Sequence, residues 1–296
     1  MNLTAASLLQ DIAAFQAQTI GSLFGTDKDE AKGDLFSTLL AQHTNANKAG
    51  AKLDDLPGSS ASSNALATNG RNLSLFDPES AYRMMSYINN RDVLYKAQFS
   101  ELNQMKAGVA QMQAAGEGLK HITTDTPDAG IKALLNNFVD RYNHWRDSFD
   151  DDIADGGLLD KMQAAEVSMY ELEQSVKNRF FGARDGLNGL SDLGIQIDPA
   201  THFASLDETR LDAALSNNRQ AIVNTIQDFS ANFAKSAGLL NAENNFIPRQ
   251  LDNLSRVIHY INDNRDSLRQ EFGTGDAARP GGKVAEALSA YNRQYA

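Results

Sequence analysis

The clearest hydrophobic pattern in this chain lies near its C-terminus. Apolar residues recur there in steps of three and four over residues 251–272, with one charged interruption at Arg265. This is the a/d spacing of a helix that packs against another helix along one side. The apolar positions are Leu251, Leu254, Ile258, Ile261, Leu268 and Phe272. One such stripe cannot be buried by itself, so the sequence predicts a partner helix elsewhere in the chain.

The best candidate for that partner is a long helix predicted over residues 78–119. Asp77 is a favourable N-cap, Pro78 suits a first helical position, and Gly116 and Gly118 mark the end of the pattern. Because both helices carry a heptad stripe, we expect residues 78–119 and 248–272 to pack antiparallel. The predicted contact residues are Tyr95, Leu102, Val109 and Met112 on the first helix and Leu254, Ile258, Ile261 and Leu268 on the second.

Between these two helices the hydrophobic pattern changes several times. Two helical stripes occupy residues 131–180, separated by an Asp-Gly-Gly turn, and two more follow between residues 207 and 240. Residues 194–198 alternate apolar and polar side chains among glycines, which predicts a short strand or an extended arm. The predicted fold is therefore mostly α: an elongated helical bundle or antiparallel coiled coil with a short extended or β-like arm near residues 190–204.

The two ends of the chain differ from this helical stalk, which we place at residues 76–282. Residues 1–24 predict a short amphipathic helix, and residues 25–75 are rich in Gly, Ser, Asn and Ala, which is typical of a flexible linker. A last amphipathic helix is predicted over residues 283–296. Each terminal helix is too short to be stable alone in water. We therefore expect them to pair as an assembly contact, through Leu8, Ile12 and Phe15 at one end and Val284, Leu288, Tyr291 and Tyr295 at the other.

Composition narrows the kinds of partner this chain can have. The formal net charge is −11 and there are no cysteines. An acidic chain repels nucleic-acid phosphates and anionic lipid, and no basic patch offsets this, so we expect no nucleic-acid or membrane binding. The densest charge run, Asp150–Asp152 with Asp155, is interpreted as a solvated face or loop. No continuous apolar stretch resembles a membrane span or a cleaved secretory signal.

No pattern of residues predicts catalysis. The five histidines are scattered without a metal-binding spacing. The acidic segment from Asp151 to Gly156 lacks the ligand order of a calcium loop, because its third position is Ile153. Phosphate-binding, nucleophile-elbow and dinucleotide motifs are not found. We therefore expect no enzyme activity, no cofactor and no metal site.

One ordered set of motifs is more specific than periodicity. A Phe-Val-x-x-Tyr-Asn core lies within residues 131–149, and a block of leucines, Gly-Ile and Asp-Glu follows within residues 187–215. Together they resemble the C-terminal region of the flagellar filament cap protein (hook-associated protein 2) family, over about residues 127–272. The matching positions are Phe138, Tyr142, Asn143, Leu193, Gly194, Ile195, Asp207, Glu208, Leu211 and Leu215.

The resemblance implies a structural function in a bacterial flagellum. It implies a homo-oligomer built through helices, contact with flagellin or hook–filament junction proteins, an export chaperone as a further partner, and export to the extracellular flagellum without a cleaved signal. The family's β-rich outer domains are missing, because only about residues 119–128 stand where they would be inserted. The alternative is a cytoplasmic coiled-coil adaptor or a flagellar export chaperone.

Overall fold

The computed structural model describes residues 69–178 and 187–295, which all belong to one compact unit. Within these ranges the fold is mostly helical with one small antiparallel sheet, so the predicted fold class is confirmed. The helices are α3 (Pro78–Gly118), α4 (Asp128–Ile153), α5 (Gln163–Lys177), α6 (Glu208–Leu240), α7 (Phe246–Asp263), α8 (Arg265–Phe272) and α9 (Gly282–Tyr295). The predicted N-terminal helix, with Leu8, Ile12 and Phe15, and linker residues 25–68 lie outside the described residues.

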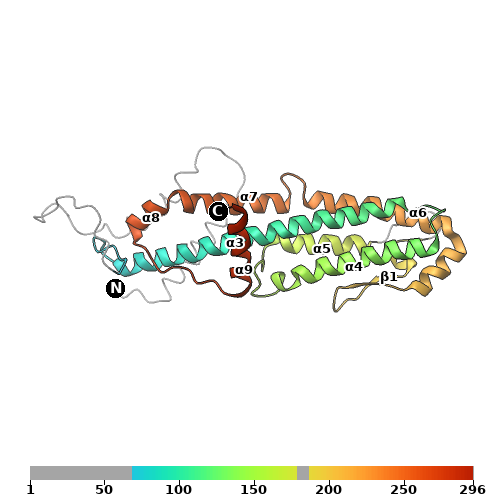
Figure 1. The fold of residues 1–296 in the computed structure, drawn as a ribbon, viewed down its shortest axis with the longest axis horizontal. Coiled ribbons are helices and arrows are strands. Elements are labelled where there is room, and N and C mark those ends of the chain that lie inside the picture. Colours follow the sequence, from blue (N-terminus) through green and yellow to red (C-terminus); the bar gives the residue numbers. More distant parts are fainter. Residues whose placement is uncertain (1–68, 179–186, 296) are drawn as a thin grey trace, which may run out of the picture. The chain divides into compact units, whose positions relative to one another are not determined.

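Helix α3 is the longest element and touches most of the others. Asp77 caps its first turn by accepting a hydrogen bond from the Ser80 amide at 3.0 Å, and Pro78 occupies the first turn, as predicted. With 41 residues the helix is about 60 Å long. Helix α4 returns antiparallel beside it, while α6 and α7 run back along it in succession (Figure 1). Helix α3 therefore supplies a shared surface for several helices.

Two polar contacts set the register of α3 against the returning chain. Asn241, just after α6, donates to the Lys106 carbonyl at 2.9 Å, and Arg265 reaches Asp92 at 2.6 Å. Helix α7 lies between these two points, so it covers α3 from about residue 92 to residue 106. The predicted positions Val109 and Met112 therefore lie level with α6 rather than with α7. The prediction misplaced them because an 18-residue helix covers less than half of the 41 residues of α3.

The predicted helix over residues 248–272 is divided into α7 and α8 at Asn264. The Asn264 side chain donates to the Tyr260 carbonyl at 2.9 Å, a local bond that competes with the regular helical pattern. Helix α6 also differs from the prediction. It joins the two predicted helical segments across a kink at Asn218, whose φ of −154° and ψ of 81° are not helical.

The predicted arm is a hairpin of two short strands. Strand β1 (Ile195–Ile197) follows the 3₁₀ turn η3 (Leu190–Leu193) and pairs antiparallel with β2 (Ala204–Leu206). The second strand was not predicted. Its three residues carry too little pattern to be distinguished from a loop. Residues 69–75, assigned to the flexible linker by composition, also have a fixed place, since Asn72 donates to the Gln270 carbonyl at 2.9 Å.

An aromatic cluster of the core lies where α3, α4 and α6 meet. Phe138 of α4 packs edge-on against Phe229 and Phe233 of α6, with ring centroids 5.3 and 5.1 Å apart. Gly116 of α3 lies under this cluster, and a Cβ atom there would stand 2.5 Å from the Phe233 ring. A side chain at Gly116 would thus displace the aromatic core. This glycine permits close helix packing in addition to standing near the end of α3.

Substitution of Ile258 by aspartate should destabilise the packing of α7 on α3. Ile258 is 1% exposed. Loss of an apolar side chain of this size costs about 1.5–3 kcal/mol, and burial of a charge adds to that, so the melting temperature should fall by roughly 10 °C. Thermal unfolding followed by circular dichroism measures this. The control His259→Asp places the same charge at the next, exposed position and should leave the melting temperature nearly unchanged. Equal melting temperatures for the two variants would contradict the packing.

Candidate functional site

Arg265, the charged residue that interrupts the heptad stripe, contacts the buried carboxylate of Asp92. Asp92 of α3 accepts hydrogen bonds from Lys96 Nζ at 2.8 Å and from Arg265 NH2 of α8 at 2.6 Å. The Asp92 side chain is only 7% exposed, and its second oxygen has no partner among the described residues. Removal of either cation would leave a buried carboxylate undercompensated. Arg265 therefore fixes the position of α8 on α3, a function that its charge alone did not reveal.

The eight residues predicted to join the two helices are nearly all inside the molecule. Leu102, Val109, Met112, Leu254, Ile258, Ile261 and Leu268 are buried, and Tyr95 is half-buried. The structure thus uses them within one chain, where they hold α3 against α6, α7 and α8. Contact with another copy requires a different surface.

Asn143 of the motif core joins α4 to the arm. Its side-chain amide donates to the Ala204 carbonyl at 2.9 Å, and its carbonyl accepts from the Ala204 amide at 2.7 Å. These two bonds pair the side chain with β2 much as a neighbouring strand would. The adjacent Tyr142 is fully buried, and its hydroxyl donates to the His202 carbonyl at 3.4 Å. Two consecutive motif residues therefore hold the hairpin on α4.

The second half of the motif fixes the start of the arm and of α6. Gly194 has a φ of +94°, and a Cβ atom there would stand 2.6 Å from the Asp207 carbonyl. Glycine is needed for both reasons. Asp207 caps α6 by accepting from the Arg210 amide at 3.0 Å, while exposed Glu208 accepts from Asn136 of α4 at 2.9 Å. The motif's apolar members are buried beneath the hairpin and α6: Phe138, Leu193, Ile195, Leu211 and Leu215.

A buried carboxylate that the sequence did not single out holds α4, α5 and the arm together. Glu173 of α5 is contacted by Arg146 of α4 at 3.1 Å and by His202 of the arm at 2.9 Å. Lys177 of α5 also pairs with it. Burial alone would raise the pKa of Glu173, but its hydrogen bonds from Lys177 and His202 outweigh this and lower it. No spacing in the sequence brings these three elements together, so the cluster could not be found without the fold.

Helix α9 crosses α3 instead of running along it (Figure 1). Its Ala287 is buried in a small cluster with Ala97 of α3 and Leu158. The rings of Tyr291 and Tyr295 meet Phe99 edge-on, with centroids 5.8 and 5.3 Å apart. Val284 and Leu288 are half-buried. The structure thus places the apolar side of α9 on α3. Its expected pairing with Leu8, Ile12 and Phe15 remains a prediction.

Lys283, in the first turn of α9, lies beside the acidic residues at the end of α4. Lys283 Nζ lies 3.3 Å from Asp152 and 3.6 Å from Asp151. The Asp152 residue is only 3% exposed, so the interpretation of this run as a solvated face does not hold for it. Glu101 of α3 lies nearby. Burial first, and the charge of Asp152 second, raise its pKa to about 7 against the lowering effect of Lys283.

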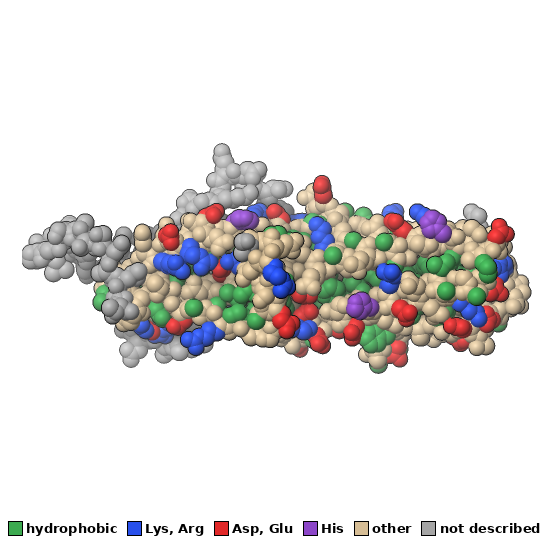
Figure 2. All heavy atoms as spheres, in the orientation of Figure 1, with side chains coloured by type: hydrophobic (Ala, Val, Ile, Leu, Met, Phe, Trp, Pro, Cys, Tyr) green, Lys and Arg blue, Asp and Glu red, His purple; other side chains and the backbone are tan. Residues whose placement is uncertain are grey.

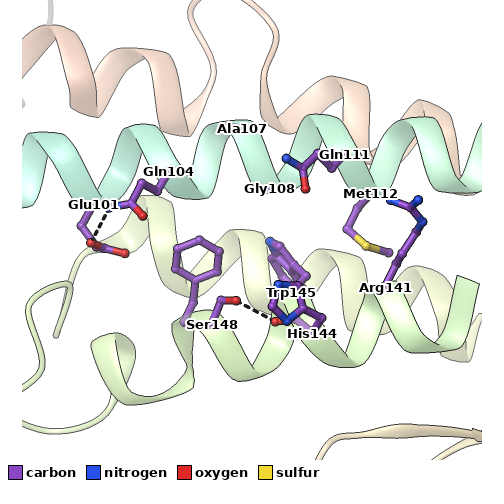
Figure 3. A pocket seen from close by; sticks show the side chains of 11 residues that line it. Glu101, Gln104, Ala107, Gly108, Gln111, Met112, Arg141, His144, Trp145 and Ser148 are labelled. Carbon is purple, nitrogen blue, oxygen red and sulfur yellow. Dashed lines mark hydrogen bonds between the residues drawn. The ribbon is translucent and has the colours of Figure 1, made fainter. Parts of the chain in front are cut away.

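A groove of about 340 Å³ lies between α3 and α4 (Figure 3). It is lined by Gln104, Gly108 and Gln111 of α3 and by Arg141, His144 and Trp145 of α4. Glu101 and Ser148 also line it. No three His, Asp or Glu side chains in residues 69–178 and 187–295 could hold a metal ion. In the same ranges no helix is long and apolar enough to cross a membrane. The groove is a gap between helices that Trp145 fills in part.

Comparison with protein families gave one match. The family model described as flagellar hook-associated protein 2 C-terminus matches residues 110–275, which is more than half of the chain. The matched span begins in α3 and runs through α8, so it contains the motif core, the arm and the Arg265 contact with α3. It extends beyond the resemblance inferred over residues 127–272. Comparisons with curated proteins and with solved structures gave no match.

Replacement of Asn143 by alanine should loosen the arm. Loss of both bonds to Ala204 should cost about 1–3 kcal/mol and speed amide hydrogen exchange in residues 195–206. Hydrogen exchange measured by mass spectrometry checks this. The control Asn137→Ala removes an exposed asparagine from the same helix. Unchanged exchange in the Asn143 variant would show that the arm is held by other contacts.

The raised pKa of Glu101 predicts a pH dependence of stability. A carboxyl group with a higher pKa in the folded than in the unfolded state binds its proton more tightly when folded. Its contribution to stability is therefore full below pH 4.5 and is lost as the pH rises to about 7. Relative to the wild type, Glu101→Gln should gain unfolding free energy across this range in urea titrations. Glu117→Gln, an exposed position on the same helix, serves as the control. Parallel pH profiles for wild type and Glu101→Gln would contradict the assignment.

Proposed function

Because the chain belongs to the flagellar hook-associated protein 2 family, we propose that it is a hook-associated, cap-like building block of the bacterial flagellum that oligomerises through its helices. The family is structural, and the match over residues 110–275 is the observation that carries the proposal. The matched span covers all of α4–α8 and the arm. The family likeness therefore covers most of the packed unit and goes well beyond a single motif.

The proposed assembly unit is the helical stalk over residues 76–282. After α3 the chain passes through the 3₁₀ turn η1 (Leu119–His121) and reaches α4 within a few residues. No outer domain interrupts the stalk between α3 and α4. We propose that the helices themselves make the contacts on which assembly depends.

The proposed partners are other copies of the chain and flagellin or hook–filament junction proteins. Acidic and basic side chains are interspersed on the face in view, with apolar side chains reaching the surface between them (Figure 2). Such a mixed surface suits contact between proteins, whereas nucleic-acid binding favours a continuous basic stripe. The proposed site of action is extracellular, after export by the flagellar apparatus without a cleaved signal and with the help of an export chaperone.

Fractionation of flagellated cells tests this proposal against the cytoplasmic adaptor or export chaperone. A tagged chain should occur in the filament–hook fraction and the medium. Its release should stop when the flagellar export ATPase is inactivated, because the chain has no other proposed route. A cytoplasmic enzyme measured in the same fractions controls for lysis. A chain that stays in the cytoplasm of cells with working export would refute the structural function and favour the chaperone.

A further inference from the structure

We infer that α9 is exchanged between neighbouring copies, so that α9 of one copy docks on α3 of the next in the place that its own α9 occupies. This inference rests on the proposed function, because it requires that copies assemble. The docking surface consists of one stretch of α3 and the end of α4 with the turn after it. Its members are Leu94, Ala97, Phe99, Asn103, Asp151, Asp152 and Leu158.

The contact between α9 and this surface is specific. Ala287 is the single residue of α9 that is fully buried. Around it, two tyrosine rings meet Phe99, and the Asn103 amide donates to the Tyr295 hydroxyl at 3.3 Å. Tyr295 itself remains 46% exposed. The aromatic and alanine contacts therefore define where α9 docks, while its opposite side stays exposed.

An ion pair at the start of α9 fixes which way the helix lies on the docking surface. Lys283 meets both Asp151 and Asp152 at the end of α4, and its own side chain is 50% exposed. The acidic pair belongs to the fixed part of the unit and the lysine to the helix that docks. When α9 leaves, Asp152 loses this cation while it is still beside Glu101. The vacated surface thus favours a helix that brings a lysine at the same position, as another copy of α9 does.

Helix α9 cannot remain stable once it is detached. It has 14 residues, and helices of about this length are marginal in water without a packing surface. Within the part of the chain that the structure describes, the surface that fits it is the one on α3, and each further copy of the chain carries the same surface. Exchange reforms every contact and changes only the hinge, which is why exchange of an identical element is a low-cost route to assembly.

The segment before α9 has the form of a hinge. Residues up to Asp276 are anchored on α3, since the Asn89 side chain donates to the Thr274 carbonyl at 3.1 Å and the Asp276 amide donates to Ser86 Oγ at 2.7 Å. Among the described residues, no backbone hydrogen bond outside the helices involves residues 277–280. Five residues span at most about 17 Å, so α9 can reach only a copy that lies directly beside α3. Short hinges of this kind favour exchange.

Disulfide trapping tests the exchange directly, because the chain has no cysteine of its own. Full-length Ala97→Cys and Ala287→Cys chains, carrying different tags, are mixed under assembling conditions and oxidised. Exchange predicts a disulfide between differently tagged chains, at a yield about tenfold above that of Ala107→Cys mixed with Ala287→Cys, because a disulfide requires Cα atoms within about 7 Å. Ala107 is exposed on α3 outside the docking surface. The half-buried pair Leu94→Cys and Val284→Cys repeats the test should Ala97→Cys not fold.

A second experiment uses the doubly substituted chain Ala97→Cys/Ala287→Cys. Its internal disulfide should leave a folded monomer that fails to oligomerise in sedimentation until it is reduced. If oligomers form but only disulfides within one chain appear, or if the locked chain still oligomerises, exchange is overturned while the proposed function stands. If the unlocked chain does not self-associate at any concentration, the exchange and the proposed self-assembly both fail.

Discussion

The structure depends on the burial of α3 from more than one side. Apolar residues occur around much of this helix, so no single partner helix can cover them. Its buried positions run from Met85 to Gly116. Helices α6 and α7 cover one side in succession, α4 lies along another, and α9 crosses it. The apolar side chains of α3 determine where α4, α6, α7 and α9 pack. The buried Asp92–Arg265 contact then fixes the register of α8 on α3.

The position of the arm depends on α3 indirectly, through α4. Asn143 and Tyr142 lie on α4, which α3 positions, and they hold β2 through its backbone rather than through its side chains. Glu173 then connects α4, α5 and the arm through its cations. The family motif is thus explained as a set of packing and hydrogen-bonding positions. This fits a structural protein, in which the shape of the subunit is what assembly requires.

Sequence patterns predicted those features that repeat or that depend on local chemistry. The start of α3 at Asp77 and Pro78 and the arm near Gly194 follow from residue types at fixed offsets. Register was not predictable, because heptad stripes on two helices match at several offsets. Contacts across long separations, such as Lys283 with Asp152 or Arg265 with Asp92, carry no local signal. The second strand and the kink at Asn218 were missed because each involves only a few residues.

We infer that helices packed firmly around α3 carry a detachable helix α9. Hydrogen exchange of the full-length chain under native conditions tests it most directly, because each amide reports the free energy of its own opening. The account predicts that amides in residues 97–112 of α3 exchange only with global unfolding, and that those of α9 exchange far sooner. Protection of α9 equal to that of α3, or rapid exchange in the middle of α3, would contradict the account.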